Sequence, residues 1–190
     1  MDNKAKIADF TLKSKAITAD LIPNTVQIEI KSQLGVGSQF KDMTEVVSVF
    51  KNEEATISHK QGQVMLVDFW ATWCPPCQEP MAHNVAMLEK NGARWGDKLR
   101  IVGLSIDKDT ETVAKHVIAK KLWAVEHYFR GGSTASADYG VTGVPKVLLI
   151  DQNGKIVYSG HPATRKLEED FEKLMKGETL TGEGLAAAAE

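Results

Sequence analysis

The hydrophobic pattern of this chain is clearest between residues 63 and 175, where short apolar runs alternate with segments of helical spacing. Val64–Trp70 and Leu99–Ile106 are nearly continuous apolar runs, which are typical of strands covered on both faces. Trp123–Phe129 is a shorter extended segment. The residues from 131 to 140 are mostly small and polar, so we expect a loop with one helical turn there.

Two segments between these runs have apolar residues three to four positions apart, which is the spacing of one helical face. The first is Pro75–Lys90, which Asn91-Gly92 is expected to close. The second is Asp107–Leu122. The residues expected to face inward are Met81, Val85 and Leu88 in the first helix and Val113, Val117 and Ile118 in the second. The alternation of strands and helices predicts an α/β layer structure.

Two hairpins flank this pattern. Lys146–Ile150 and Lys155–Tyr158 are joined through Asn153-Gly154, and Asn-Gly is the strongest short-range hairpin signal. Val46–Phe50 and Ala55–Ser58 enclose a polar tetrapeptide, which predicts a hairpin leading into the domain.

The same pattern divides the chain into three parts. Residues 45–176 form the α/β domain, and a helix over Thr164–Lys176 ends it. Residues 1–44 are expected to form an N-terminal extension, with a strand at 25–31 where apolar and polar residues alternate. Residues 177–190 are expected to form a flexible tail.

Composition narrows the possible classes of function. The chain has 190 residues, of which 43% are hydrophobic and 25% charged, enough for one core with appendages. Its formal net charge of −2 offers no cationic surface for nucleic acid. No segment approaches the ~20 apolar residues of a membrane span, and the first ten residues contain no signal-peptide core. We therefore expect a cytoplasmic protein, although an exported protein that had lost its signal peptide would give the same indication.

The only two cysteines, Cys74 and Cys77, follow the first apolar run and are separated by two prolines. A strand that delivers a Cys-x-x-Cys pair to the start of a helix suits dithiol–disulfide exchange, because the helix N-terminus favours the thiolate. Pro75 and Pro76 have no N–H group, so the Cys77 N–H is the chief donor left for a Cys74 thiolate. An inert bridge or two ordinary buried thiols are the alternatives.

A zinc site is disfavoured, because structural zinc needs four ligands and no histidine pair has ligand spacing. We therefore expect no metal and no cofactor other than a redox-active Cys74–Cys77 disulfide.

Several motifs resemble one known family. Leu66–Cys77 resembles the active-site segment of thioredoxin-fold thiol–disulfide oxidoreductases, and Cys-Pro-Pro-Cys is similar to that of nucleoredoxins, tryparedoxins and bacterial TlpA-like reductases. Gly143–Pro145, Leu148–Lys155 and Ile101–Asp107 support the resemblance, which covers residues 56–176. It implies a thioredoxin-like α/β fold, with a central mixed sheet flanked by helices and an N-terminal β extension.

The resemblance also implies roles for individual residues. Cys74 would attack the substrate disulfide, Cys77 would resolve the mixed disulfide, and Asp68 would accept a proton from Cys77 because burial raises the pKa of a carboxyl group. The residues implied to contact substrate are Trp73, Pro75, Pro76, Val144 and Pro145, with a cis peptide bond between the last two. The plainer alternatives are a sheet-end role for Asp68, packing for Trp73, and a trans turn at Pro145.

The chain departs from the family pattern at several positions. Gly103 occupies the place where many thioredoxins have a lysine beside the buried carboxylate, and Lys146, which could add positive potential near the nucleophile, follows the cis-proline. Pro80 stands where TlpA-like proteins have glutamate, with Glu79 one residue earlier. Most of the histidines are expected to be surface or packing residues, and His83, on the active-site helix, is the one to test for an influence on Cys74.

Three classes of function follow from these observations. The first, which we favour, is a general cytosolic reductase of disulfides in proteins, supplied with electrons by a thioredoxin reductase or another dithiol. The second is a redox-regulated binding module that engages its partner through residues 1–60. The third is an exported reductase dedicated to one partner, of the cytochrome-maturation type.

Overall fold

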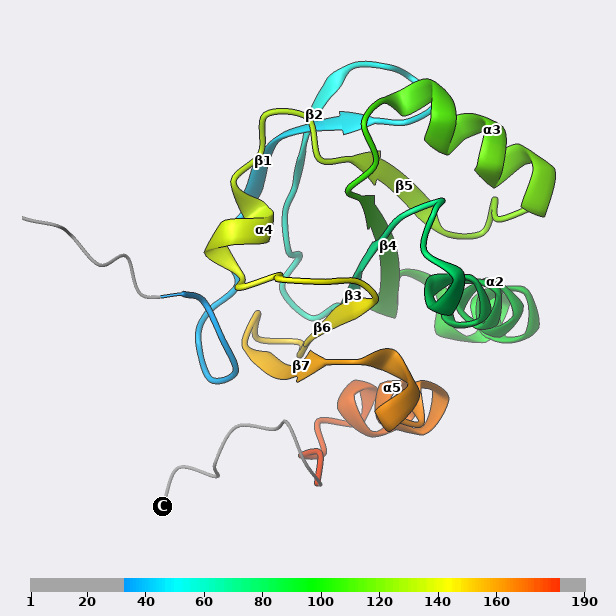
Figure 1. Cartoon of the computed structure of the whole chain (residues 1–190). Helices are drawn as coiled ribbons and strands as arrows, with labels where there is room; N and C mark the ends of the chain where they lie inside the picture. The colour runs from blue at the N-terminus through cyan, green and yellow to red at the C-terminus, as the bar shows by residue number, and fades with distance from the viewer. Residues whose placement is uncertain (1–32, 182–190) are drawn as a thin grey trace, which may run out of the picture. The chain divides into compact units, whose positions relative to one another are not determined.

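A computed structural model describes residues 33–181. Seven strands form one mixed sheet in the order β2-β1-β5-β4-β3-β6-β7 (Figure 1). The strands are β1 (Met43–Ser48), β2 (Glu54–Ile57), β3 (Val64–Trp70), β4 (Leu99–Ser105), β5 (Glu126–Phe129), β6 (Lys146–Ile150) and β7 (Ile156–Gly160). The helices are α2 (Pro75–Trp95), α3 (Thr110–Lys120), α4 (Ala135–Asp138) and α5 (Leu167–Met175), with 3₁₀ turns at Gly96–Lys98 and Pro162–Thr164.

The centre of the sheet consists of two consecutive parallel crossovers. β3, β4 and β5 are parallel neighbours, and α2 and α3 connect them in turn. Because such crossovers are right-handed, two crossovers that move in the same direction place both helices on one face of the sheet. β6 and β7 add antiparallel strands beside β3, and β1 joins β5 antiparallel at the other side. The predicted thioredoxin-like mixed sheet flanked by helices is confirmed.

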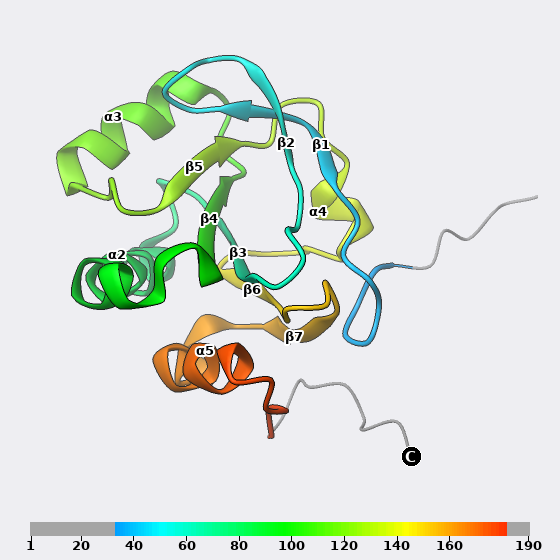
Figure 2. The same cartoon turned by 180° about the vertical axis from the view of Figure 1, so that it is seen from behind.

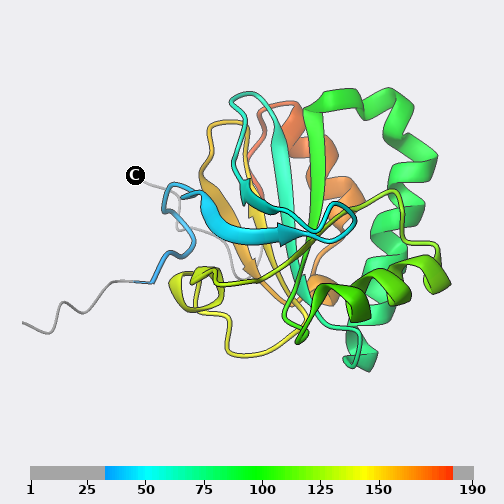
Figure 3. The same ribbon diagram turned by 90° about the horizontal axis from the view of Figure 1, so that it is seen from above.

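The sheet separates two apolar cores. The core on the α2 side, here called the α2-side core, includes residues of β3, α2, α3 and α5: Leu66, Trp70, Met81, Val113 and Phe171 are members. The core on the other face, here called the α4-side core, includes Met65, Val67, Phe69, Leu104 and Tyr139. Figures 1 and 2 show α4 on the opposite side of the sheet from α2 and α3, and Figure 3 shows the same layers from above.

Both predicted hairpins are present. β6 and β7 pair antiparallel around a turn in which Gly154 has φ of +81°, a left-handed conformation that favours glycine. β1 and β2 also pair antiparallel, and they lead into the parallel part of the sheet. The predicted helical turn at 131–140 is α4.

The predicted end of the first helix is wrong. α2 continues through Asn91 and Gly92 to Trp95, and Gly96, with φ of +55°, caps it. Asn91 is buried and donates a hydrogen bond to Glu168 Oε1 at 2.9 Å, so packing against the last helix stabilises the extra turn. Pro80 lies inside α2.

The predicted inward position of Ile118 is also wrong. Val113 and Val117 of α3 are fully buried, whereas 52% of the surface of Ile118 is exposed. α3 begins after Asp109, whose side chain accepts a hydrogen bond from the Thr112 N–H, and ends at Lys121 in a left-handed conformation. The helix is therefore shorter than predicted, and only two of the three apolar positions face the sheet.

The segments that flank the domain are described in part. The strand predicted at residues 25–31 lies outside the described residues. Leu34, Val36 and Phe40 pack against the α4-side core. After α5, Leu180 packs against the α2-side core. Within residues 33–181, no helix is both long and apolar enough to cross a membrane.

Candidate active site

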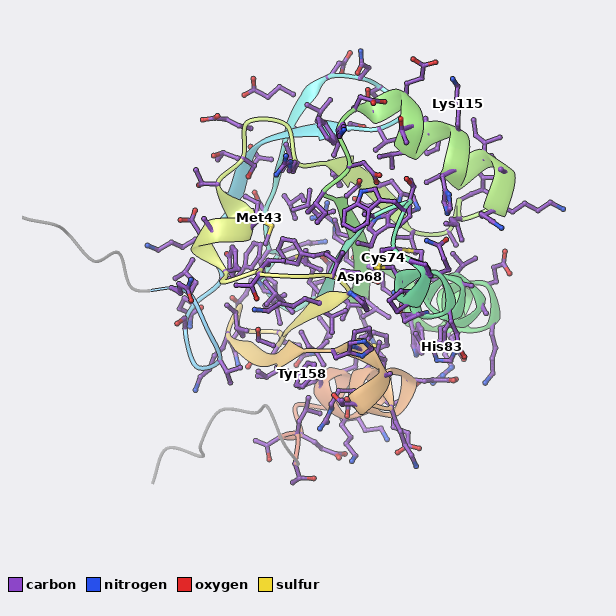
Figure 4. All side chains as sticks on the ribbon, viewed as in Figure 1. Met43, Asp68, Cys74, His83, Lys115 and Tyr158 are labelled. Carbon is purple, nitrogen blue, oxygen red and sulfur yellow. A yellow bond between two sulfur atoms is a disulfide. The ribbon has the colours of Figure 1, made fainter. Side chains whose placement is uncertain are left out.

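Strand β3 delivers the two cysteines to the start of α2. Cys74 is the N-cap residue of α2, and it forms a disulfide with Cys77, the Cα atoms being 5.4 Å apart. Cys74 is 3% exposed and Cys77 1% exposed, whereas the neighbouring Trp73 is 63% exposed. Figure 4 shows Cys74 at the sheet end of α2, with Asp68 nearby on the sheet. The predicted placement of the pair at a helix N-terminus is confirmed.

The first turn of α2 has fewer free backbone N–H donors than an ordinary helix. Pro75 and Pro76 occupy its first positions and provide none. The Cys77 N–H donates to the carbonyl oxygen of Cys74 at 3.1 Å. In the disulfide form, the Cys77 N–H, which was expected to donate to a Cys74 thiolate, is therefore already bonded to a backbone oxygen.

The loop before β6 lies against the disulfide. The Val144-Pro145 peptide bond is cis, as predicted. The carbonyl oxygen of Val144 is 3.7 Å from Cys74 Sγ. Pro145 is buried and Val144 is half-buried. Segments that are 70 residues apart in the chain are thus brought together at the cysteine pair.

Asp68 is a buried carboxyl group on β3, facing α2. It is 1% exposed, and desolvation raises its pKa from 3.8 to about 8. The Asn84 side chain donates to Asp68 Oδ2 at 3.0 Å and opposes that shift, while Asp68 Oδ1 has no protein partner among the described residues. Asn84 was missed by sequence reasoning, because a polar residue inside an amphipathic helix gives no signal that it is buried.

The strand register places Gly103 beside Asp68, as predicted. The space over Gly103 is occupied by His127, Trp70 and Met81, which a Cβ atom there would meet at 3.0, 3.1 and 3.2 Å. His127 is 5% exposed, and burial lowers its pKa to about 4, so it is neutral near pH 7. The neighbour of the carboxyl group is therefore a neutral aromatic cluster.

The histidine that reaches the active-site segment is His116, contrary to the expectation for His83. His116 Nε2 lies 2.7 Å from Gln78 Oε1 in the first turn of α2, and its ring lies against Trp70. His83 lies farther along α2, in a hollow that it shares with residues 165–169 (Figure 4). No periodicity in the sequence distinguishes His116, because the contact joins α2 to α3.

The expected contribution of Lys146 to the potential near Cys74 is not supported. Lys146 pairs with Phe69, so its side chain is on the α4 side of the sheet. Its ammonium group donates to the carbonyl oxygens of Tyr139 and Gly140, at 3.1 and 2.8 Å.

Within residues 33–181, no group of three or more His, Cys, Asp or Glu side chains could hold a metal ion.

Comparison with known proteins agrees with this geometry. A family model described as thioredoxin-like matches residues 62–156, half of the chain. The thioredoxin-like protein YneN of Bacillus subtilis is 27% identical over 156 residues, which cover 80% of this chain and 86% of the relative. The thiol-disulfide oxidoreductase ResA of Bacillus cereus is 26% identical over 131 residues, covering 68% and 73%.

A solved structure adds support for the fold. A Chlorobium tepidum protein proposed to be the thiol:disulfide interchange protein DsbE superimposes with a TM-score of 0.62 and 26% identity, over 74% of this chain and 96% of that one. These relatives do not support the nucleoredoxin and tryparedoxin branches suggested by Cys-Pro-Pro-Cys. The chain belongs to the thioredoxin-like family and is a thiol–disulfide oxidoreductase with its cysteine pair at Cys74 and Cys77.

Proposed function

We propose that this enzyme reduces disulfides in protein substrates with Cys74 as the nucleophile and Cys77 as the resolving thiol. The observation that carries the proposal is the position of Cys74 at the N-cap of α2, in a disulfide with Cys77. The positive end of the helix dipole favours a thiolate at that position. Cys77 lies three residues further into the helix, and both cysteines are almost fully buried.

The reaction is two successive exchanges. The Cys74 thiolate attacks one sulfur of the substrate disulfide, a mixed disulfide forms, and the other substrate sulfur leaves as a thiolate. The Cys77 thiolate then attacks Cys74 Sγ, and the remaining substrate sulfur leaves. The substrate gains two electrons and the cysteine pair loses two. A dithiol protein or a thioredoxin-reductase-type donor must then return two electrons to the Cys74–Cys77 disulfide.

Asp68 is proposed as the proton acceptor for Cys77. A thiol has an ordinary pKa near 8.5, and burial raises the pKa of Asp68 to about 8. Groups of nearly equal pKa exchange a proton at low cost near neutral pH, which is the property required of a general base.

The substrate-contacting surface is proposed to surround Cys74. Trp73, Pro75 and Pro76 are exposed beside it, and Val144 approaches it from the loop before β6. Pro145, in the same loop, is buried. An extended substrate segment that reaches the buried sulfur would contact these residues, with the Trp73 ring supplying apolar area.

A general reductase is the first candidate function. The low exposure of Cys74 favours a second candidate, a reductase dedicated to one partner. Because only 3% of Cys74 is exposed, a substrate has to fit the surrounding surface closely to reach the sulfur. This property suits a reductase dedicated to one partner, such as an exported protein of the cytochrome-maturation type. A cytoplasmic location remains a prediction of the sequence alone.

The insulin-disulfide reduction assay with dithiothreitol tests the proposal. The intact chain is expected to precipitate reduced insulin several times faster than dithiothreitol alone, and Cys74→Ser and Cys77→Ser are each expected to fall to that background. Turnover that survived in either variant would contradict a dithiol mechanism. An intact chain no faster than dithiothreitol would exclude a general reductase and favour the dedicated one.

A further inference from the structure

The side-chain amide of Gln78 lies among the carbonyl groups of the active-site segment. Gln78 Nε2 donates to the carbonyl oxygen of Cys74 at 3.0 Å, and it makes longer contacts with those of Ala71 and Thr72, at 3.4 and 3.5 Å. The Cys74 carbonyl also accepts the Cys77 N–H, so two donors fix the orientation of the Cys74-Pro75 peptide. One donor is a backbone N–H of the first turn of α2, and the other exists only because residue 78 is glutamine.

The neighbouring helix α3 fixes the orientation of this amide. Gln78 Oε1 can only accept, so the His116 Nε2 atom 2.7 Å away is the donor. The His116 ring also lies 5.6 Å from the Trp70 ring, centroid to centroid, which holds it between the end of β3 and the start of α2. A flipped Gln78 amide would direct its oxygen at three carbonyl oxygens and its NH₂ group at the imidazole N–H.

Residues at the start of the α3 connection hold the same segment from a second side. Asp107 is 2% exposed and accepts hydrogen bonds from the Thr72 N–H at 2.9 Å and the Thr72 hydroxyl at 2.7 Å. Ser105 also donates to Asp107, at 2.6 Å. Thr72 is thus anchored independently of the cysteine bond, and the Gln78 amide adds the contact that reaches Cys74 itself.

The two prolines increase the importance of the Gln78–Cys74 hydrogen bond for holding the Cys74 backbone. Pro75 and Pro76 remove two backbone donors from the first turn of α2, which leaves few groups to hold Cys74 once the disulfide opens. The Gln78 amide bonds to backbone oxygen, not to sulfur, so its contacts do not require the Cys74–Cys77 bond. It can therefore keep the two sulfurs close in the dithiol and in the mixed disulfide.

We propose that Gln78, oriented by His116, is a positioning residue that holds the Cys74 backbone for closure of the Cys74–Cys77 disulfide. The inference rests on the proposed function, because it assumes that the pair cycles between dithiol and disulfide. Holding two reacting groups in place raises their effective concentration, so the contact favours the disulfide and speeds its formation. His116 has the same Nε2–H donor whether it is neutral in this tautomer or protonated, so the effect does not depend on the charge of His116.

The thiol–disulfide equilibrium with glutathione tests the inference without any protein substrate. The full chain is equilibrated with mixtures of reduced and oxidised glutathione, quenched with acid, alkylated, and analysed by mass spectrometry for the Cys74–Cys77 disulfide. Gln78→Met has similar length without the amide, and it is expected to lower the equilibrium constant for disulfide closure by about 3- to 10-fold. His116→Phe retains an aromatic ring beside Trp70 but loses the donor, and a shift in the same direction is expected.

Two neighbouring residues supply matched controls. Glu79→Met changes the exposed residue next to Gln78, and His83→Phe changes an exposed histidine of α2. Both controls are expected to stay within twofold of the wild type. Wild-type equilibria in Gln78→Met and His116→Phe would overturn the inference while leaving the proposed function intact. A wild-type chain that stayed in the dithiol form in excess oxidised glutathione would overturn the proposed function itself.

Discussion

Strand β3 directs Leu66, Asp68 and Trp70 towards α2, and it directs Met65, Val67 and Phe69 towards the opposite face of the sheet. None of these six side chains is more than 1% exposed. The α4-side residues are uniformly apolar. On the α2 side, by contrast, the strand contributes a carboxyl group and an indole, and it leads directly into the cysteine pair.

The same contrast holds for hydrogen bonding. Among the described residues, four buried side-chain atoms have no partner within the protein: Asp68 Oδ1, Trp70 Nε1, Asn84 Oδ1 and His127 Nδ1. All four belong to residues packed on the α2 side, around β3. A buried polar group without a partner costs free energy. The α2 side of β3 therefore carries buried polar groups that cost stability, whereas the α4 side of the strand is apolar.

The largest expected effect is on the apolar face. Phe69→Ala deletes a fully buried ring and is expected to lower the free energy of unfolding by about 3–5 kcal/mol. No titratable group is removed, so the loss is expected to be equal at pH 5 and pH 8. Urea unfolding at both pH values measures it. A loss below ~1 kcal/mol, or one that changed with pH, would contradict a purely apolar role for the α4 side of β3.

Asp68→Asn is expected to raise stability, in contrast to Phe69→Ala. The pKa of Asp68 is raised from 3.8 to about 8 in the folded state, so the folded protein retains a proton that the unfolded chain releases. Wild-type stability therefore falls as pH rises from about 4 to about 8. A shift of about 4 pKa units at about 1.4 kcal/mol per unit corresponds to ~6 kcal/mol, and the buried amide of the variant keeps part of the desolvation cost. The variant is therefore expected to gain about 2–4 kcal/mol at pH 8 and nothing at pH 3. Urea unfolding across this range that gave parallel curves for both proteins would contradict the assignment.

The same substitution is expected to slow the chemistry. If Asp68 accepts the proton of Cys77, Asp68→Asn slows resolution of the mixed disulfide by at least about 10-fold at pH 7. Ellman's reagent measures this step, because Cys74 releases the first thionitrobenzoate and Cys77 the second. Val67→Ala, on the opposite face of the same strand, is the control and should leave the second release unchanged. An unchanged rate of the second release in Asp68→Asn would show that Asp68 does not accept the proton of Cys77.

The smallest expected effect tests how tightly the α2 side is packed. Gly103→Ala places a Cβ atom 3.0 Å from His127 Nδ1 and 3.1 Å from Trp70 Nε1, and it is expected to lower stability by about 1 kcal/mol. Gly92→Ala, inside α2 with no atom within 4 Å of the new Cβ, is expected to raise stability by about 0.5–1 kcal/mol. Thermal melting compares the two variants, and equal signs would show that the cluster around Gly103 can relax.

Most of the fold follows from local sequence patterns. Burial on both faces requires a run of apolar residues, and this run identifies β3 and β4. The left-handed turn between β6 and β7 requires glycine, and Asn-Gly identifies it. The end of α2 could not be predicted in this way. Asn91 is a helix-ending signal in isolation, but its bond to Glu168 joins residues 77 positions apart.

Some residues of the candidate site could be predicted from the sequence, and others could not. Cys74, Cys77 and the Val144-Pro145 cis bond were identified from motifs, and the register places Gly103 as expected. The polar partners that surround them could not be identified. Helix–strand packing brings Asn84 to Asp68, and helix–helix packing brings His116 to Gln78. Such packing has no sequence period.

Trapping of the mixed disulfide tests the order in which the two thiols react. Cys77→Ser is incubated with a disulfide-containing protein such as insulin, and mass spectrometry locates the bond. A stable adduct on Cys74 is expected in Cys77→Ser, and no stable adduct is expected in Cys74→Ser. An adduct on Cys77 in the Cys74→Ser variant, with none in Cys77→Ser, would reverse the proposed order of the thiols.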